Sequence, residues 1–130
     1  MHMISIVAPM FNEEENLTST LTKIKNEFAR LNRNDYELIF VNDGSTDKTW
    51  KKANELADNE DVLRVVGYPV NQGRGKALRT GLEAAKGDIV ITVDFDLSYD
   101  AEHIGAMLEA LEENPQVDLV LVSAYMPGGK

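Results

Sequence analysis

Hydrophobic residues follow two different patterns along the chain: short, almost continuous apolar runs, and longer segments with an apolar residue at every third or fourth position. The short runs predict strands at Ile4–Ala8, Tyr36–Val41, Val62–Val66, Ile89–Val93 and Val117–Val122. The longer segments predict helices over about Glu13–Leu31, Asp47–Ala57, Lys76–Lys86 and Ala101–Glu112. Strands that alternate with helices indicate an α/β fold. We expect a Rossmann-like, open and mostly parallel sheet with helices on both faces.

The helical spacing also predicts which side chains face the sheet. The expected inward positions are Leu17, Leu21, Ile24, Phe28 and Leu31 in the first helix, Trp50, Ala53 and Ala57 in the second, Leu78, Leu82 and Ala85 in the third, and Ile104, Met107, Leu108 and Leu111 in the fourth. Gly87 follows the third helix and is expected to cap its carboxyl end. The chain shows no repeat or linker, so residues 1–130 are expected to form a single domain.

Composition and charge exclude several classes of function. The chain has no cysteine, which excludes disulfides and thiolate metal sites and favours an intracellular, cytoplasmic setting. No apolar run reaches the roughly 20 residues of a transmembrane helix. The net charge of −9 argues against nonspecific binding to nucleic acid. A phosphate-rich ligand would therefore need a metal ion or a few well-placed basic residues.

The polar residues of interest lie in the loops that follow the predicted strands. These loops are Pro9–Glu15, Asn42–Thr46, Gly67–Gly75 and Asp94–Asp100. In a parallel sheet the carboxyl ends of the strands share one edge, where open α/β sheets bind their ligands. We therefore expect the four loops to meet around one site.

Asp94 and Asp96 follow an apolar strand and are separated by one residue. Residues i and i+2 of an extended chain point to the same side, so the two carboxylates can share one cation. Ligation by oxygen alone favours Mg²⁺ or Mn²⁺. A calcium loop of the EF-hand type is a poor alternative, because Tyr99 replaces the required glycine and a strand precedes the motif. A haloacid dehalogenase-like phosphatase is a further alternative, although its Asp-x-Asp motif normally opens the sheet.

The other three loops each allow a structural or a functional interpretation. Asn12 and Glu15 could form a capping box at the start of the first helix. Asp43 could be an ordinary turn residue before Gly44, or an acceptor for a base N–H or a ribose hydroxyl. The segment 71–76 combines two glycines with Arg74 and precedes a helix, which favours an anion site. Its spacing matches neither a P-loop nor a dinucleotide fingerprint, and a solvated basic turn stays open.

Four segments together resemble the family 2 glycosyltransferases. They are Val7–Glu14, Val41–Asp47, Asn71–Ala77 and Val93–Ser98, whose order and spacing match the nucleotide-sugar-binding half of the GT-A fold. Within that family, the residues after Asp96 and the closing segment 125–129 resemble the dolichyl- and polyprenyl-phosphate sugar transferases. The resemblance covers nearly the whole chain.

The resemblance implies a nucleoside pocket built from the first two loops. Pro9, Phe11 and Glu13 would line the pocket for the base and ribose. Asp43 would accept hydrogen bonds from the base, with Ser45 beside it.

The resemblance also implies a site for the diphosphate. Gly73, Arg74 and Lys76 would border the pyrophosphate and sugar. Asp94 and Asp96 would act in catalysis by holding Mg²⁺ or Mn²⁺ between the two phosphates, with Asp94 also near the donor.

The function implied by the resemblance is inverting transfer of a sugar from a UDP- or GDP-sugar, with a polyprenyl or dolichyl phosphate as the expected acceptor. Family members continue into an acceptor-binding region, so residues 1–130 would be the donor-binding part. This part would work at the cytoplasmic face of a membrane, without a transmembrane segment of its own. A nucleotide-binding module without transferase activity remains the alternative.

Overall fold

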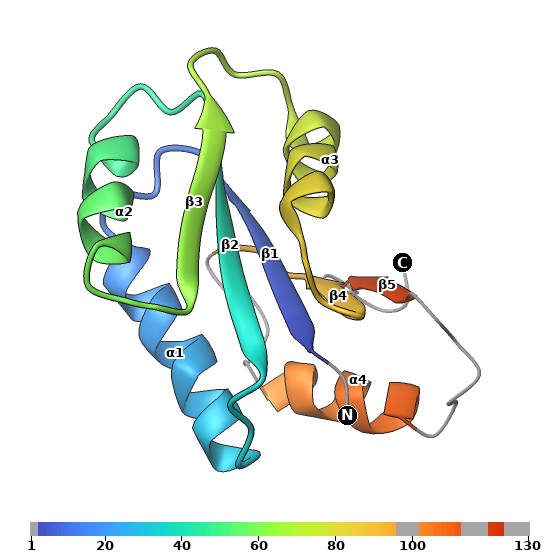
Figure 1. The fold of residues 1–130 in the computed structure, drawn as a ribbon. Helices are drawn as coiled ribbons and strands as arrows, with labels where there is room; N and C mark the ends of the chain where they lie inside the picture. The colour runs from blue at the N-terminus through green and yellow to red at the C-terminus, as the bar shows by residue number, and fades with distance from the viewer. Residues whose placement is uncertain (1–2, 96–101, 113–119, 124–130) are drawn as a thin grey trace.

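The computed structural model of the protein describes residues 3–95, 102–112 and 120–123. Its elements are β1 (Ile4–Met10), α1 (Leu17–Arg30), β2 (Tyr36–Asp43), α2 (Thr49–Ala57), β3 (Leu63–Tyr68), α3 (Arg74–Ala84), β4 (Ile89–Thr92), α4 (Glu102–Glu112) and β5 (Val120–Ser123). Each predicted element is present, with ends that differ by a few residues. Figure 1 shows the strands side by side, with the helices flanking them.

The strands form one sheet in the order β3-β2-β1-β4-β5, and every pairing is parallel. The chain moves outward from β1 to β3, then crosses back to place β4 on the other side of β1. The order reverses between β1 and β4, and the crevice at such a reversal is where open α/β sheets bind ligands. The predicted Rossmann-like class is confirmed.

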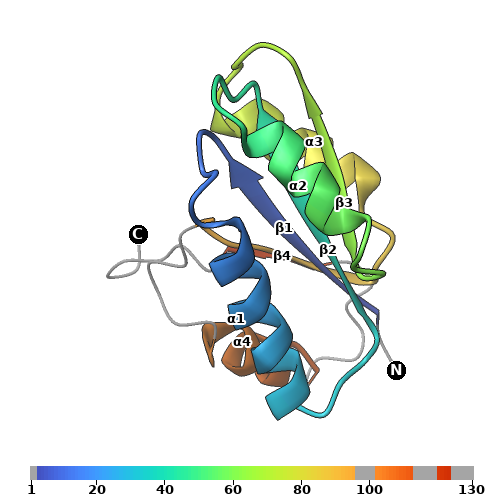
Figure 2. The same cartoon turned by 90° about the vertical axis from the view of Figure 1, so that its left-hand side faces the viewer.

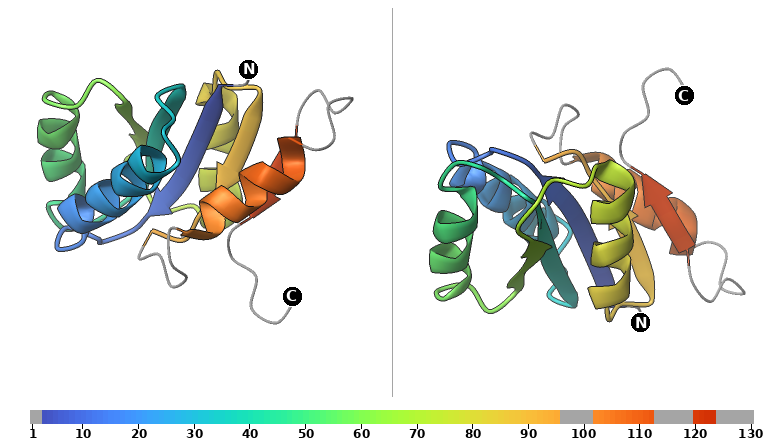
Figure 3. Two further views of the ribbon diagram at one scale, coloured as in Figure 1. Left: turned by 90° about the horizontal axis from the view of Figure 1, so that it is seen from below. Right: turned by 90° about the horizontal axis from the view of Figure 1, so that it is seen from above.

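Helices cover both faces of the sheet, which forms the middle of three layers. On one face, α1, α2 and α4 pack against a core that includes Ile6, Phe40 and Ile91. On the other face, α3 packs against a smaller cluster that includes Val7 and Ile39. Figure 2 shows α1 and α2 in front of the strands and α3 behind them. Figure 3 shows α1 and α4 on the face opposite α3.

Strand β1 extends further than its neighbour β4. Its pairing with β4 ends at Val7 and Thr92, whereas its pairing with β2 continues to Met10 and Asn42. Pro9, which has no backbone N–H, lies in this extension, beyond the last ladder pair with β4. Pro9 and Met10 of this extension, and Asp94 and Phe95 after β4, line the candidate site.

The inward faces of two helices differ from the prediction. In α2, Trp50 was expected to face the sheet, but its side chain is 42% exposed and Thr49 is buried instead. The Thr49 hydroxyl bonds Asp47 Oδ1 at 2.5 Å and accepts the Glu13 N–H at 2.8 Å, which fixes the rotation of the helix. These polar contacts outweigh the apolar periodicity.

In α3 the fully buried positions are Ala77 and Gly81, while the predicted Leu78 and Leu82 pack at the margin of the cluster. A Cβ at Gly81 would lie 2.4 Å from a Val7 methyl group, so small residues let this helix approach the sheet closely. The capping role predicted for Gly87 is wrong: the helix ends in the extended residue Ala85.

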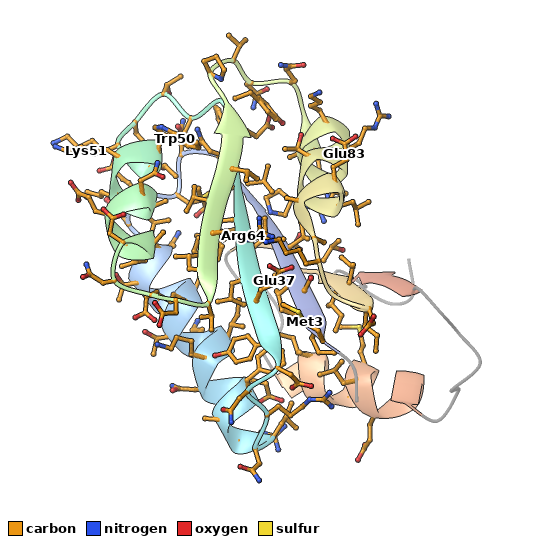
Figure 4. The ribbon with its side chains drawn as sticks, in the orientation of Figure 1. Met3, Glu37, Trp50, Lys51, Arg64 and Glu83 are labelled. Atoms are coloured by element: carbon orange, nitrogen blue, oxygen red, sulfur yellow. The ribbon has the colours of Figure 1, made fainter. Side chains whose placement is uncertain are left out.

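A buried carboxylate ties the first three strands to the turn after α3. Glu37 accepts hydrogen bonds from the Ser5 hydroxyl at 2.6 Å, the Lys86 N–H at 2.7 Å and the Arg64 guanidinium at 2.8 Å. Figure 4 shows Arg64 and Glu37 pointing toward one another from β3 and β2. The Arg64 guanidinium also donates to the carbonyl of Ala84. This network fixes α3 on its face of the sheet.

No helix in the described ranges is long and apolar enough to cross a membrane. The longest, α1, has 14 residues, whereas a transmembrane helix needs about 20. Its outer face is polar, as expected for a helix that packs against a sheet on one side only.

Candidate functional site

A cleft of about 290 Å³ opens at the carboxyl edge of the sheet. It is lined by Pro9, Met10, Phe11, Glu13, Asp43, Arg74, Asp94 and Phe95. Six of these were predicted as site residues, and they come from three strand ends and the start of α3. Met10 and Phe95 were not predicted, since each is an apolar residue that the sequence assigns to the core. The structure thus gathers residues that lie far apart in the sequence around one cavity.

Asn12 joins the loop after β1 to the loop after β2. It has a positive φ of 54°, and its side-chain oxygen accepts the N–H of Thr46 at 2.8 Å and of Asp47 at 3.3 Å. Its own N–H donates to the Ser45 hydroxyl at 2.9 Å. The predicted capping box is therefore wrong, because Asn12 caps the neighbouring loop while α1 begins at Leu17. Ser45 fixes this loop and does not line the cleft.

The two acidic residues after Asn12 strengthen the same connection. The Glu13 N–H donates to Thr49, and Glu14 Oε1 accepts the Lys48 N–H at 3.0 Å. The Glu13 side chain reaches the cleft wall and accepts a hydrogen bond from Asn16 at 2.7 Å. The first two loops therefore form one hydrogen-bonded unit.

Asp43 is the most enclosed polar group of the cleft, with 6% of its surface exposed. Its Oδ1 accepts the Tyr68 hydroxyl at 2.8 Å and the Gln72 N–H at 2.9 Å, and its Oδ2 accepts the Asn71 amide at 3.0 Å. The same amide nitrogen donates to the Asp43 carbonyl at 3.0 Å. These bonds from protein groups fix the orientation of the carboxylate in the cleft wall.

Tyr68 and Asn71 were not predicted as site residues. Tyr68 stands opposite Asp43 where β3 and β2 end together, a register that the sequence alone does not determine. Burial raises the pKa of the Tyr68 phenol, and its hydrogen bond to Asp43 and the charge of that carboxylate raise it further. Tyr68 therefore keeps its proton and acts as a donor to Asp43.

Gly44 lets the second and third loops touch through their backbones. Its φ is +62°, which agrees with the predicted turn, and a Cβ here would lie 2.0 Å from the Asn71 nitrogen. No side chain fits in this space. The contact holds Asn71 where its amide reaches Asp43.

The loop before α3 supplies the basic part of the site. Gly73, with φ +94°, precedes the helix, whose first N–H groups point out of its amino end. Arg74 Nη1 lies 3.2 Å from Asp94 Oδ1, so the third and fourth loops meet through an ion pair. Lys76 does not line the cleft, and its ammonium lies 5.9 Å from the ring centroid of Tyr68. Of the three residues predicted in this loop, Arg74 lines the cleft, whereas Gly73 and Lys76 do not.

The residues of the fourth loop are consistent with a hard divalent cation. Asp94 offers a carboxylate to the cleft, and the nearby Arg74 shows that this position already attracts positive charge. Among the described residues no three acidic or histidine side chains cluster as a complete metal site. Mg²⁺ commonly uses one or two carboxylates together with phosphates and water, so a full protein cage is not required. The predicted partner Asp96 lies outside the described residues.

Comparison with known proteins assigns the family. Residues 5–130 match the family model described as glycosyl transferase family 2, and the chain therefore belongs to this family. It is 35% identical over 127 residues to a dolichol-phosphate mannosyltransferase of Pyrococcus furiosus, an alignment that covers 98% of this chain and 34% of the relative.

Solved structures show the same fold. The mannosyltransferase PcManGT of Pyrobaculum calidifontis, in complex with GDP-Man and Mn²⁺, matches with a TM-score of 0.65 and 27% identity, over 73% of this chain and 28% of that one. S. aureus TarS in complex with UDP-GlcNAc matches with a TM-score of 0.67 and 28% identity, over 87% and 32%. The fold is thus that of the GT-A glycosyltransferases.

The chain spans about a third of the length of the relatives that it matches. The aligned third contains the strand-end loops that form the cleft. The comparisons therefore define the family and the fold. The two solved structures are named with donors that carry different bases, guanine and uracil.

Proposed function

We propose that this domain binds the nucleotide part of a UDP- or GDP-sugar in the cleft, together with Mg²⁺ or Mn²⁺, and takes part in transfer of the sugar. The observation that carries the proposal is the meeting of Asp43, Arg74 and Asp94 around one cavity at the carboxyl edge of the sheet. Two solved structures with the same fold are named as complexes with GDP-Man and Mn²⁺ and with UDP-GlcNAc. Residues 1–130 would form the donor-binding part of the enzyme.

The nucleoside would occupy the part of the cleft built by the first two loops. Asp43 would accept an N–H of the base, since it is the buried carboxylate of the wall. Phe11 has 43% of its surface exposed and offers a flat face for stacking against a base. Pro9 and Glu13 would border the ribose, and Ser45 would act by holding the loop.

The diphosphate would lie toward Arg74 and the amino end of α3. Gly73 leaves the backbone open there, and Lys76 adds a second positive charge. Asp94, with Asp96, would hold the cation. A bound divalent cation supplies Lewis-acid stabilisation of the charge that builds on the leaving diphosphate. The residues around it fix the position of the donor and keep it oriented for attack from the opposite side of the sugar, with inversion.

The acceptor that best fits the relatives is a lipid phosphate, as in the name of the Pyrococcus protein. A phosphate monoester has its second pKa near ~6, so it is largely ionised at neutral pH and can attack without a protein base. This agrees with a donor domain in which no histidine lines the cleft within the described residues. The reaction would take place at the cytoplasmic face of a membrane.

Calorimetric titration with UDP and with GDP, in the presence and absence of Mn²⁺, tests the proposal. At least one nucleotide should bind, and Mn²⁺ should tighten binding at least about tenfold, the effect of about 1.4 kcal/mol. Asp94→Asn should remove the metal-dependent part. Asp58→Asn, at an exposed position after α2, is the matched control and should bind like the native chain. Metal-independent binding of equal strength in the native chain and Asp94→Asn would refute the role of the cation.

The alternative of a binding module without transferase activity predicts the same titrations but no transfer. Incubation of the full chain with a labelled nucleotide sugar and a polyprenyl phosphate separates the two, because only an enzyme forms the labelled lipid. The haloacid dehalogenase alternative disagrees with the family assignment.

A further inference from the structure

The hydrogen bonds of Asp43 limit which base it can recognise. An ionised carboxylate has two oxygens with about four acceptor positions in total. Three of them are filled by groups of the protein itself. A base that binds in the cleft can therefore use only the acceptor position that remains on the carboxylate.

Oδ1 has no acceptor position left for a ligand. The Tyr68 hydroxyl and the Gln72 N–H approach it at 2.8 Å and 2.9 Å. Both donors come from the end of β3 and the loop after it, and Gly44 holds that loop against the backbone of the second loop. The two bonds are thus part of the fold and precede the ligand.

Oδ2 accepts one bond from the Asn71 amide at 3.0 Å and has one position left. The orientation of this amide is fixed, because the same nitrogen also lies 3.0 Å from the Asp43 carbonyl. Turning the amide over would bring its oxygen against two other oxygens. Asp43 lines the cleft, and the one acceptor position of its carboxylate that no group of the described residues fills is on Oδ2.

The two donor bases differ in the number of adjacent N–H groups on their pairing edge. Guanine presents N1–H next to the N2 amino group, a pair that matches both oxygens of a carboxylate at once. Uracil presents a single N3–H between two carbonyl oxygens. A carboxylate with one free position satisfies the single N–H donor of uracil but leaves one guanine donor without a partner, and an unsatisfied buried donor is costly.

We propose that the base read by Asp43 is uracil rather than guanine, and that Tyr68 is the positioning residue that sets this preference by occupying Oδ1. The inference rests on the function proposed above, since it names the donor class for the same cleft. Tyr68 touches the carboxylate and not the ligand. Its effect is to remove the second acceptor that guanine requires.

Titration of the full chain with UDP and with GDP, both with Mn²⁺, tests the base directly. UDP should bind at least about tenfold more tightly, as expected when one hydrogen bond to a charged group is missing for GDP. Equal or tighter binding of GDP would overturn this inference and leave the proposed function standing. If neither nucleotide binds, both this inference and the proposed function are overturned.

Tyr68→Phe tests the role of the hydroxyl. The variant frees a position on Oδ1, so the preference for UDP over GDP should fall to within about threefold, less than a single hydrogen bond provides. If the substitution only loosened the loop, it would weaken the binding of both nucleotides and leave the ratio of their affinities unchanged. That result would refute the positioning role. Tyr36→Phe is the control: this residue stacks on Phe28 where β2 begins, away from the cleft, and should keep the native ratio.

Discussion

Arg74 and Asp94 form an ion pair with 3.2 Å between Nη1 and Oδ1, across the part of the cleft where the diphosphate and its cation are proposed to bind. The guanidinium and a divalent cation would compete for the same carboxylate. Replacing Arg74 by alanine should therefore have opposite effects on two ligands.

Arg74→Ala should bind Mn²⁺ alone about two- to fivefold more tightly, which is the effect of a partly exposed ion pair. The same variant should bind the nucleoside diphosphate more weakly, because a positive charge near the phosphates is lost. Mn²⁺ titration followed by electron paramagnetic resonance, and calorimetry with the nucleotide, measure the two effects. Arg79→Ala, at an exposed position of the same helix, is the control. Unchanged Mn²⁺ affinity in Arg74→Ala would show that the pair does not compete with the metal.

The buried carboxylate of Glu37 should be important for stability. Glu37→Ala removes the acceptor of the Arg64 guanidinium and the Ser5 hydroxyl. Because Arg64 is partly exposed and keeps its bond to the Ala84 carbonyl, the cost should be about 1–3 kcal/mol. Denaturant unfolding measures this cost. Glu83→Ala, at an exposed position of α3, should change the free energy of unfolding by less than about 0.5 kcal/mol. Similar values for both variants would contradict the role of the network.

The same residue predicts a dependence of stability on acidity. Burial raises the pKa of the Glu37 carboxyl, but hydrogen bonds from Ser5, the Lys86 backbone and Arg64, with the charge of Arg64, outweigh burial and leave the pKa below its ordinary value of 4.5. A lowered pKa in the folded state contributes stability above 4.5 that is lost as the pH falls through the folded value. Unfolding measured from neutral pH down to the acid range should show this loss, and Glu37→Ala should show less of it. If the native protein and Glu37→Ala lose the same stability over the same pH range, titration of other groups causes the loss.

Two glycines of α3 should respond in opposite ways to the same substitution. Gly81→Ala places a methyl group against Val7 and Val41, and overpacking of this kind costs about 1–3 kcal/mol. Gly75→Ala meets no atom within 4 Å and gains helix propensity of up to about 1 kcal/mol. Thermal unfolding of the two variants compares them directly. Destabilisation by both would show that helix contacts with the sheet are not the cause.

Much of the fold could be predicted from the sequence because each strand is a run of apolar residues and each helix has one apolar face. The errors lie where a polar contact between distant segments decides the local structure. Asn12 bonds to the loop after β2, so the first helix begins later than a capping box would place it. Thr49 bonds to Asp47 and Glu13, so α2 turns Trp50 outward. Periodicity contains no information about such bonds.

The site was predictable to the extent that parallel strands place their following loops at one edge. This rule and the family motifs together predicted six of the residues that line the cleft. Tyr68 and Asn71 were missed because their role is to bond another side chain, which depends on the register of β2 and β3 and on the backbone contact at Gly44. Residue type alone does not reveal it.

The part of the cleft proposed for the nucleoside and the part proposed for the diphosphate are held together in different ways. On the nucleoside side, backbone and side-chain bonds join the first two loops before any ligand arrives, so little conformational entropy remains to be lost there on binding. On the phosphate side, the wall is closed by a partly exposed ion pair, which costs little to separate. A donor bound as proposed would meet a rigid surface at its base, while the residues around its charged end could rearrange to fit different sugars and cations.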